Sequence, residues 1–120
     1  MNPVFKSVHD SENVARLSYG LAFAKYTGSR GKVLANDADA EFLQEIRQIF
    51  DKNKIKYQSG GFGKVDEGGG GTVAKFLAYY GIRTVDAGPA LLSMHSLFEI
   101  SSKADLYETY RAYKVFFELN

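Results

Sequence analysis

The sequence predicts an α/β domain in which helices flank a mixed β-sheet, and three observations favour this fold class. Several short segments alternate apolar residues with small or polar ones, which is the period of a strand. Three longer segments repeat apolar residues every three or four positions, as on one face of a helix. Along the 120 residues these segments follow the order β-α-β-α-β-β-α, an alternation typical of a sheet covered by helices.

The first half of the chain is predicted to form a strand, a helix and a second strand. Alternation over 17–26 predicts the first strand, and the Gly- and Ser-containing residues 27–31 predict a turn after it. Asn36 and Asp37 are expected to cap the helix that follows. One face of that helix is apolar and consists of Phe42, Leu43, Ile46, Ile49 and Phe50. Residues 54–59 then predict a short strand that ends at two glycines.

The second half begins with another amphipathic helix. Its apolar residues are Val73, Phe76, Leu77 and Tyr80. Gly81 is expected to end this helix, since glycine adopts the left-handed conformation that ends many helices. Residues 82–87 predict a third strand and residues 98–101 a short fourth one.

The last predicted element is a C-terminal helix. Ser102 followed three residues later by Asp105 resembles a capping box, which places the helix start there. The apolar side chains that are expected to pack against the sheet recur at spacings of four, three and four: Leu106, Tyr110, Tyr113 and Phe117.

Composition excludes several classes of function. The chain is 45% hydrophobic, which is enough for one ordinary core. Its 15 Lys and Arg residues nearly balance 14 Asp and Glu residues, so nucleic acid is not an expected partner. It has no run near the ~20 apolar residues of a membrane helix, and nothing resembling a secretory signal. The absence of cysteine favours the cytoplasm and restricts any metal ligands to His, Asp, Glu and water.

His95 is the strongest candidate for chemistry, because it lies at the end of an otherwise apolar segment that follows the predicted strand 82–87. A neutral imidazole is a common zinc ligand, and Glu99 or Asp86 is close enough in sequence to orient it. No second histidine lies at metal-binding spacing, so a purely structural histidine is the alternative. His9 and Asp10 lie in a polar stretch that a solvated loop explains equally well.

A glycine run, 68–71, precedes the predicted second helix together with Thr72. Backbone N–H groups at such a junction favour a phosphate or carboxylate, although the run lacks the Lys-Ser or Lys-Thr pair of a P-loop. A flexible turn is the alternative. Lys25 at the end of the first strand is placed to meet a substrate carboxylate, or is an ordinary surface lysine.

Five segments together resemble the aminopeptidase I and aspartyl aminopeptidase family of zinc metallopeptidases. They are Asn-Pro-Val-Phe at 2–5, Lys-Tyr-Thr-Gly-Ser-Arg-Gly-Lys at 25–32, Ala-Asn-Asp-Ala-Asp-Ala-Glu-Phe at 35–42, Gly-Gly-Gly-Gly-Thr at 68–72 and Asp-Ala-Gly-Pro-Ala-Leu-Leu-Ser-Met-His-Ser at 86–96. The resemblance spans nearly the whole chain in order.

This resemblance implies a peptidase that removes single residues from peptide N-termini, using two zinc ions, a metal-bound hydroxide and a glutamate base. His95 matches the family's final metal ligand. Residues that match the substrate cleft are Lys25, Gly70, Gly71, Thr72 and Met94. The chain is thus expected to bind peptide substrates.

The same resemblance implies that residues 1–120 are the C-terminal part of a catalytic domain. The other metal ligands, the general base and a dimerisation domain are expected upstream of this segment. One ligand should neither hold two zinc ions nor catalyse, so the chain alone is expected to be inactive. A partial sheet exposes an edge and an apolar face, which predicts a homo-oligomer. The alternatives are a non-catalytic, self-associating module and, third, a phosphate- or nucleotide-binding domain.

Overall fold

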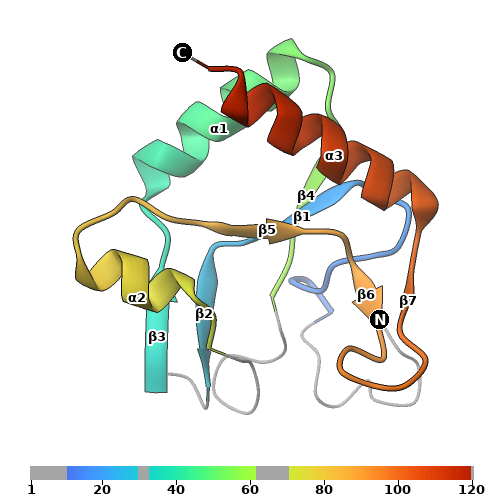
Figure 1. The fold of residues 1–120 in the computed structure, drawn as a ribbon, viewed down its shortest axis with the longest axis horizontal. Coiled ribbons are helices and arrows are strands. Elements are labelled where there is room, and N and C mark those ends of the chain that lie inside the picture. Colours follow the sequence, from blue (N-terminus) through green and yellow to red (C-terminus); the bar gives the residue numbers. More distant parts are fainter. Residues whose placement is uncertain (1–10, 30–32, 62–70, 120) are drawn as a thin grey trace.

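The computed structural model describes residues 11–29, 33–61 and 71–119 and contains seven strands and three helices within these ranges (Figure 1). In chain order they are β1 Leu21–Ala24, β2 Tyr26–Ser29, β3 Val33–Asp37, α1 Ala40–Lys52, β4 Tyr57–Ser59, α2 Ala74–Tyr79, β5 Asp86–Gly88, β6 Leu91–Leu92, β7 Ile100–Ser101 and α3 Lys103–Phe117. The predicted α/β class is therefore confirmed.

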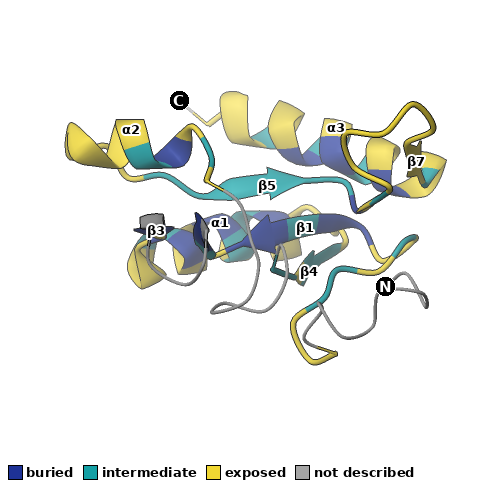
Figure 2. Ribbon diagram, turned by 90° about the horizontal axis from the view of Figure 1, so that it is seen from below, coloured by how far each residue is buried: buried dark blue, intermediate teal, exposed yellow. Residues whose placement is uncertain are grey.

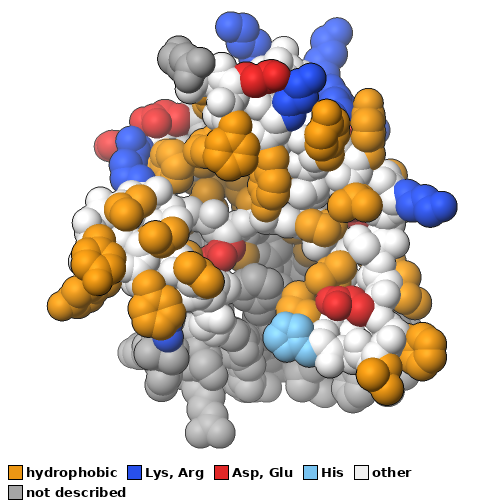
Figure 3. Space-filling model, viewed as in Figure 1, with side chains coloured by type: hydrophobic (Ala, Val, Ile, Leu, Met, Phe, Trp, Pro, Cys, Tyr) orange, Lys and Arg blue, Asp and Glu red, His pale blue; other side chains and the backbone are white. Residues whose placement is uncertain are grey.

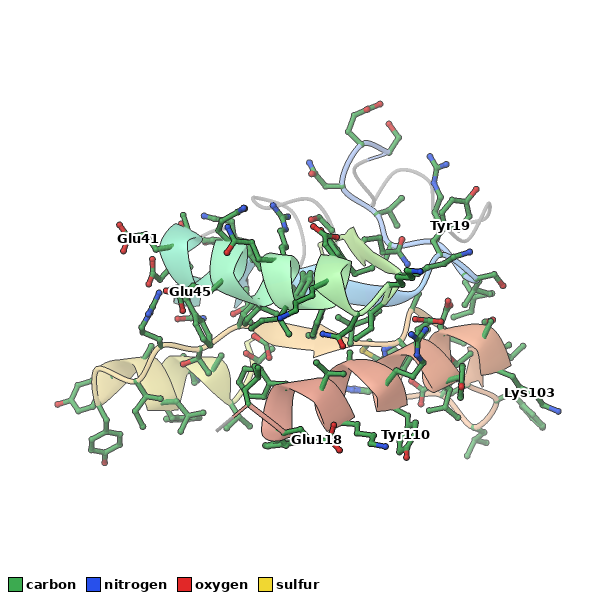
Figure 4. All side chains as sticks on the ribbon, turned by 90° about the horizontal axis from the view of Figure 1, so that it is seen from above. Tyr19, Glu41, Glu45, Lys103, Tyr110 and Glu118 are labelled. Atoms are coloured by element: carbon green, nitrogen blue, oxygen red, sulfur yellow. The ribbon has the colours of Figure 1, made fainter. Side chains whose placement is uncertain are left out.

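The central sheet is mixed, as predicted, and has the strand order β4-β1-β5. Strand β1 pairs in parallel with β4, from Leu21 opposite Tyr57 onwards, and antiparallel with β5. Strands β2 and β3 form a separate antiparallel pair, and so do β6 and β7. Seen from below and from above, α1 lies on one side of β5, whereas α2 and α3 lie on the other (Figures 2 and 4).

The hydrophobic core forms where α1 packs against β1. Helix α1 buries Leu43, Ile46 and Phe50, which are three of the five residues predicted for its apolar face. The ring of Phe23 in β1 stacks on that of Phe50, with 5.6 Å between the ring centroids. Ala112 of α3 completes this core, because its small side chain lets the helix approach closely.

Several local predictions were wrong. Residues 27–29, which were predicted to be part of a turn, belong to β2 because they pair with β3. Asn36 and Asp37 belong to β3, and Asp39 caps α1 instead, accepting a hydrogen bond from the Glu41 N–H at 2.9 Å. The strand predicted over 82–87 begins only at Asp86.

Most of the apolar residues predicted to pack against the sheet from α2 and α3 are instead exposed. In α2 only Ala74 is buried, and the residues expected to face the core are exposed (Figure 2). In α3 the buried residues are Asp105, Thr109 and Ala112, so a different face meets the sheet. The predicted end of α2 is confirmed, since Gly81 has a φ of 74°.

The predicted capping box at α3 is absent. Helix α3 begins after Ser102 as expected, but the Ser102 side chain makes no capping hydrogen bond. The Asp105 carboxylate accepts hydrogen bonds from the backbone N–H groups of Ser18 at 2.7 Å and Gly20 at 2.8 Å. This residue therefore joins α3 to the loop before β1.

Candidate functional site

Thr72 and Asp86 form a polar pair between the start of α2 and the start of β5. The Thr72 hydroxyl donates to Asp86 Oδ2 at 2.7 Å and accepts from the Ala74 N–H at 3.3 Å. Both residues are partly buried. The Asp86 carboxylate thus fixes the Thr72 hydroxyl beside α2, and through β5 it also fixes Thr72 relative to β1.

Tyr113 of α3 lies against the same strand. Its hydroxyl donates to the Ala87 carbonyl oxygen at 2.5 Å. Burial, and then the negative charge of Asp86, raise the pKa of the Tyr113 hydroxyl, since both disfavour a phenolate. Tyr113 is therefore a neutral hydrogen-bond donor at neutral pH.

Lys25 follows β1 and forms an ion pair with Asp37 at the end of β3. The distance from Lys25 Nζ to Asp37 Oδ1 is 2.5 Å, and the two side chains are 48% and 60% exposed. The Ala38 N–H donates to the Lys25 carbonyl oxygen at 2.7 Å, which fixes the backbone on both sides of the pair. The ammonium group is thus accessible to a ligand and already bound to a carboxylate.

Met94 and His95 lie in the turn between β6 and β7. Ser93 and His95 have φ values of 57° and 66°, and the Ser96 N–H donates to the Ser93 carbonyl oxygen at 3.0 Å. Both Met94 and His95 are exposed. The His95 imidazole forms no hydrogen bond or ion pair with any described residue, Glu99 and Asp86 included, so neither orients it as the sequence suggested.

Some of the predicted site residues come together in the fold. Ala24 lies opposite Asp86, so Lys25 and the Thr72–Asp86 pair share one end of the β1–β5 ladder. His95 follows the other end of β5, beyond β6 (Figure 1). Gly71 is exposed next to Thr72, whereas Gly70, the rest of the run from 68, His9 and Asp10 lie outside the described residues.

Sequence reasoning missed two contacts at this site. It assigned Asp37 to a helix cap and considered Asp86 a partner of His95. The contact between Lys25 and Asp37 had a sequence signal. The two residues are 12 positions apart, and a strand, a turn and a returning strand bring residues at such a separation side by side. Thr72 and Asp86 lie on either side of α2, and no local sequence pattern predicts their contact.

The described residues include a candidate zinc ligand, His95, but they do not form a complete zinc site. The His95 imidazole is exposed and has no hydrogen-bond partner among the described residues, so its ring nitrogens are accessible to a metal ion. A catalytic zinc normally takes three protein ligands and a water. Within residues 11–29, 33–61 and 71–119 no group of three or more His, Cys, Asp or Glu side chains could hold a metal ion.

The start of α2 is a poor anion site. The helix has only six residues, so its dipole is small, and its N-cap residue Val73 makes no side-chain capping hydrogen bond. The Asp86 carboxylate next to Thr72 adds a negative charge that repels a phosphate. This geometry disfavours the phosphate- or nucleotide-binding alternative.

None of the helices in the described ranges is both long enough and apolar enough to cross a membrane.

The comparisons with known proteins agree with the resemblance. The family model described as aminopeptidase I zinc metalloprotease, M18, matches residues 1–117. The chain is 60% identical over 118 residues to the probable M18 family aminopeptidase 1 of Borrelia garinii subsp. bavariensis and 56% identical to that of Thermotoga neapolitana. Each match covers 98% of this chain and 26% of the relative, so the chain spans about a quarter of its relatives' length.

Solved structures of relatives contain the same fold. The crystal structure of an M18 family aminopeptidase from Thermotoga maritima superposes with a TM-score of 0.91 at 55% identity, over 98% of this chain and 26% of that chain. Aminopeptidase I from Clostridium acetobutylicum gives a TM-score of 0.89 at 50% identity, over 96% and 25%. The fold and the family match together assign the chain to a class described as zinc metalloproteases. More particularly, the chain belongs to the M18 aminopeptidase family.

Proposed function

We propose that this chain forms part of a zinc aminopeptidase that releases N-terminal amino acids from peptides. In this proposal His95 supplies one metal ligand. The observation that carries it is the M18 match over residues 1–117, combined with an exposed imidazole that no described residue engages. The absence of cysteine makes the cytoplasm the proposed compartment.

The substrate side of the proposed site is built from residues that follow β1, precede α2 and follow β6. Lys25 presents an ammonium group, and Thr72 a hydroxyl fixed by Asp86. Gly71 and Met94 are exposed and available to contact a peptide, and Gly70 is assigned the same role from the family resemblance. These residues bind and orient the substrate, while the metal, when bound, would activate water.

The 120 residues alone are proposed to be inactive, because His95 is a single ligand. The remaining ligands and the general base would come from polypeptide equivalent to the other three quarters of the relatives' length. That polypeptide, or a second copy of this chain, would also cover exposed apolar side chains of α2 and α3. A homo-oligomer without bound zinc is the second candidate, a module that keeps the fold only for assembly.

A two-component reconstitution tests the first proposal. The 120-residue chain is co-purified with the part of the Thermotoga neapolitana aminopeptidase that lies outside the matched segment. We expect zinc binding and hydrolysis of leucine p-nitroanilide by the complex, and neither by the chain alone. His95→Ala should reduce activity at least about 100-fold while the complex still forms, because the metal loses a ligand.

Lys103→Ala serves as the matched control, since this exposed residue at the start of α3 lies outside the proposed site. An assembled, zinc-containing complex that does not hydrolyse the anilide would contradict the aminopeptidase proposal. Full activity of the His95→Ala complex would contradict the role of His95. If the chain forms zinc-free oligomers that do not bind the complementing polypeptide, the second candidate function, a non-catalytic assembly module, would be supported.

A further inference from the structure

Strand β5 is an edge strand of the central sheet, and its outer side pairs with no other strand of the described residues. Phe23 of β1 lies opposite Ala87 in the β1–β5 ladder. The Phe23 carbonyl oxygen accepts from the N–H of Gly60, which follows β4, at 2.9 Å, so it points away from β5. Phe23 and Ala87 are therefore a non-hydrogen-bonded pair, and the Ala87 N–H and carbonyl group point away from β1.

The hydroxyl of Tyr113 occupies part of this outer edge. It donates to the Ala87 carbonyl oxygen at 2.5 Å, and this oxygen is the acceptor that a neighbouring strand would use. Tyr113 is 45% exposed, so an incoming chain can reach it. A single side-chain hydroxyl thus stands where a paired strand would donate its backbone N–H.

The other edge of the sheet, at β4, is covered by the chain itself. Residues 13–16 run alongside it, and the Gly61 N–H donates to the Asn13 carbonyl oxygen at 2.5 Å. The Gln58 side chain bonds to the backbone N–H and to the carbonyl oxygen of Arg16, each at 2.8 Å. Of the two edges, β5 is therefore the one at which a further strand can pair.

The surroundings of β5 fit a partner with apolar side chains. Helices α2 and α3 lie on the same side of β5, and hydrophobic side chains gather over both (Figures 2 and 3). Among these, Phe76 and Tyr110 are each 60% exposed. Val85 and Ala87 pack against the core but are only partly buried. A polypeptide that adds a strand at β5 can also bury apolar surface of the two helices.

We propose that the outer edge of β5 receives a β-strand of the polypeptide that lies outside the matched segment in the relatives, and that Tyr113 caps this edge until the strand displaces its hydroxyl. This inference rests on the proposed function, in which that polypeptide supplies the other metal ligands. The occupant follows from length, because the chain covers 26% of the relative and leaves most of that polypeptide to be placed. An open edge strand is a template for such pairing.

The exchange of backbone amides tests the docking edge in the unmodified chain. Exchange rates are followed by NMR for the chain alone and for its complex with the part of the Thermotoga neapolitana aminopeptidase outside the matched segment. The Ala87 N–H should exchange at least about tenfold more slowly in the complex, because it gains an acceptor. The Gly88 N–H, which faces β1, is the internal reference and should change less.

Two results of this measurement would contradict the proposal. Unchanged exchange at Ala87 in an assembled complex would overturn the docking edge. Slow exchange at Ala87 in concentrated solutions of the chain alone would assign the edge to a second copy, and would overturn the proposed occupant.

Tyr113→Phe tests the cap, because it keeps the ring and removes the donor. Without the hydrogen bond to Ala87 the incoming strand has less to displace, so the Kd of the complex should fall roughly two- to tenfold. Isothermal titration calorimetry measures this constant. Tyr110→Phe removes an exposed hydroxyl one helical turn earlier and is the matched control, whose Kd should not change. An unchanged or higher Kd in Tyr113→Phe would refute the cap.

Ala87→Pro should block the edge. Proline is tolerated where the N–H of an edge strand faces outward, so the hydrogen bonds between β1 and β5 are kept, and circular dichroism checks the fold. The Kd should rise at least about tenfold, because the edge loses its donor. Undiminished affinity in the folded variant would contradict the docking edge, and if the variant does not fold, the exchange rate at Ala87 decides. An assembled complex that protects Ala87 but hydrolyses no leucine p-nitroanilide would contradict the proposed function and support the docking edge.

Discussion

At the scale of single residues, the buried carboxylate of Asp105 joins α3 to the loop before β1. Its side chain is fully buried, and its two oxygens accept the N–H groups of Ser18 and Gly20. Both residues have positive φ values, 69° and 90°, so the loop turns its N–H groups toward one point. A Cβ on Gly20 would meet the Lys56 carbonyl oxygen at 2.2 Å, which leaves room for glycine only.

Replacing Asp105 should therefore lower the stability of the folded chain. Asp105→Ala leaves two N–H groups without their acceptor, and we expect it to lower the free energy of unfolding by about 3 kcal/mol or more. Asp105→Asn keeps one acceptor and should lose about 1–2 kcal/mol. Urea unfolding followed by circular dichroism measures both. Glu118→Gln, at an exposed carboxylate, is the control, and an equal loss there would contradict this account.

At the scale of elements, the N-terminus of α1 links folding to pH. The Glu41 N–H lowers the pKa of the Asp39 carboxyl by hydrogen bonding, burial opposes this shift, and the Arg83 guanidinium lowers the pKa further. A carboxyl whose pKa is lower in the folded state stabilises the fold above its ordinary pKa. That contribution is lost as the pH falls through the lowered value.

We therefore expect Asp39→Asn to flatten the acid branch of the stability profile. Between about pH 5 and pH 2 the free energy of unfolding should fall less steeply in the variant than in the unmodified chain. Urea titrations at each pH provide the measurement. Asp51→Asn removes a carboxylate from the other end of α1 and serves as the control. Parallel acid branches for Asp39→Asn and the unmodified chain would refute the linkage.

Periodicity predicted α1 well, because three of its five apolar residues meet the core. It failed for α3, where the apolar series Leu106, Tyr110, Tyr113 and Phe117 is largely exposed. The face that packs instead contains Asp105 and Thr109, whose polar groups are satisfied within the fold. The acceptors and donors lie up to 87 residues apart, so a local pattern cannot reveal this face.

The candidate site, too, was predicted only in part from the sequence. Lys25, Thr72, Met94 and His95 were named from the sequence, and the family match supports the resemblance that named them. Their binding roles remain predictions. The carboxylate partners of Lys25 and Thr72, which are Asp37 and Asp86, emerged only from the structure. Strand register depends on contacts along the whole chain, so charge compensation at Lys25 required the structure.

At the scale of the whole molecule, much of the apolar surface has no partner within the described residues. Hydrophobic side chains gather over α2, α3 and the turn between β6 and β7 (Figure 3). Tyr79 and Leu97 are 86% and 97% exposed. Tyr110 points from α3 away from the sheet and α1 (Figure 4). Such a surface is typical of a segment that packs against further polypeptide, consistent with a chain spanning a quarter of its relatives' length.

The outer face of α3 provides the test of this interpretation. Leu106 and Tyr110 are one helical turn apart and about 60% exposed, so they form a continuous apolar surface. We expect the purified chain to self-associate, and the double variant Leu106→Glu, Tyr110→Glu to shift toward the monomer, because association would then bury unpaired carboxylates. Light scattering gives the mass of each species. Lys103→Glu introduces a carboxylate at the first residue of α3, outside this apolar surface, and is the control. A compact monomer of the unmodified chain would rule out self-association, and oligomers that persist in the double variant would assign it to another surface.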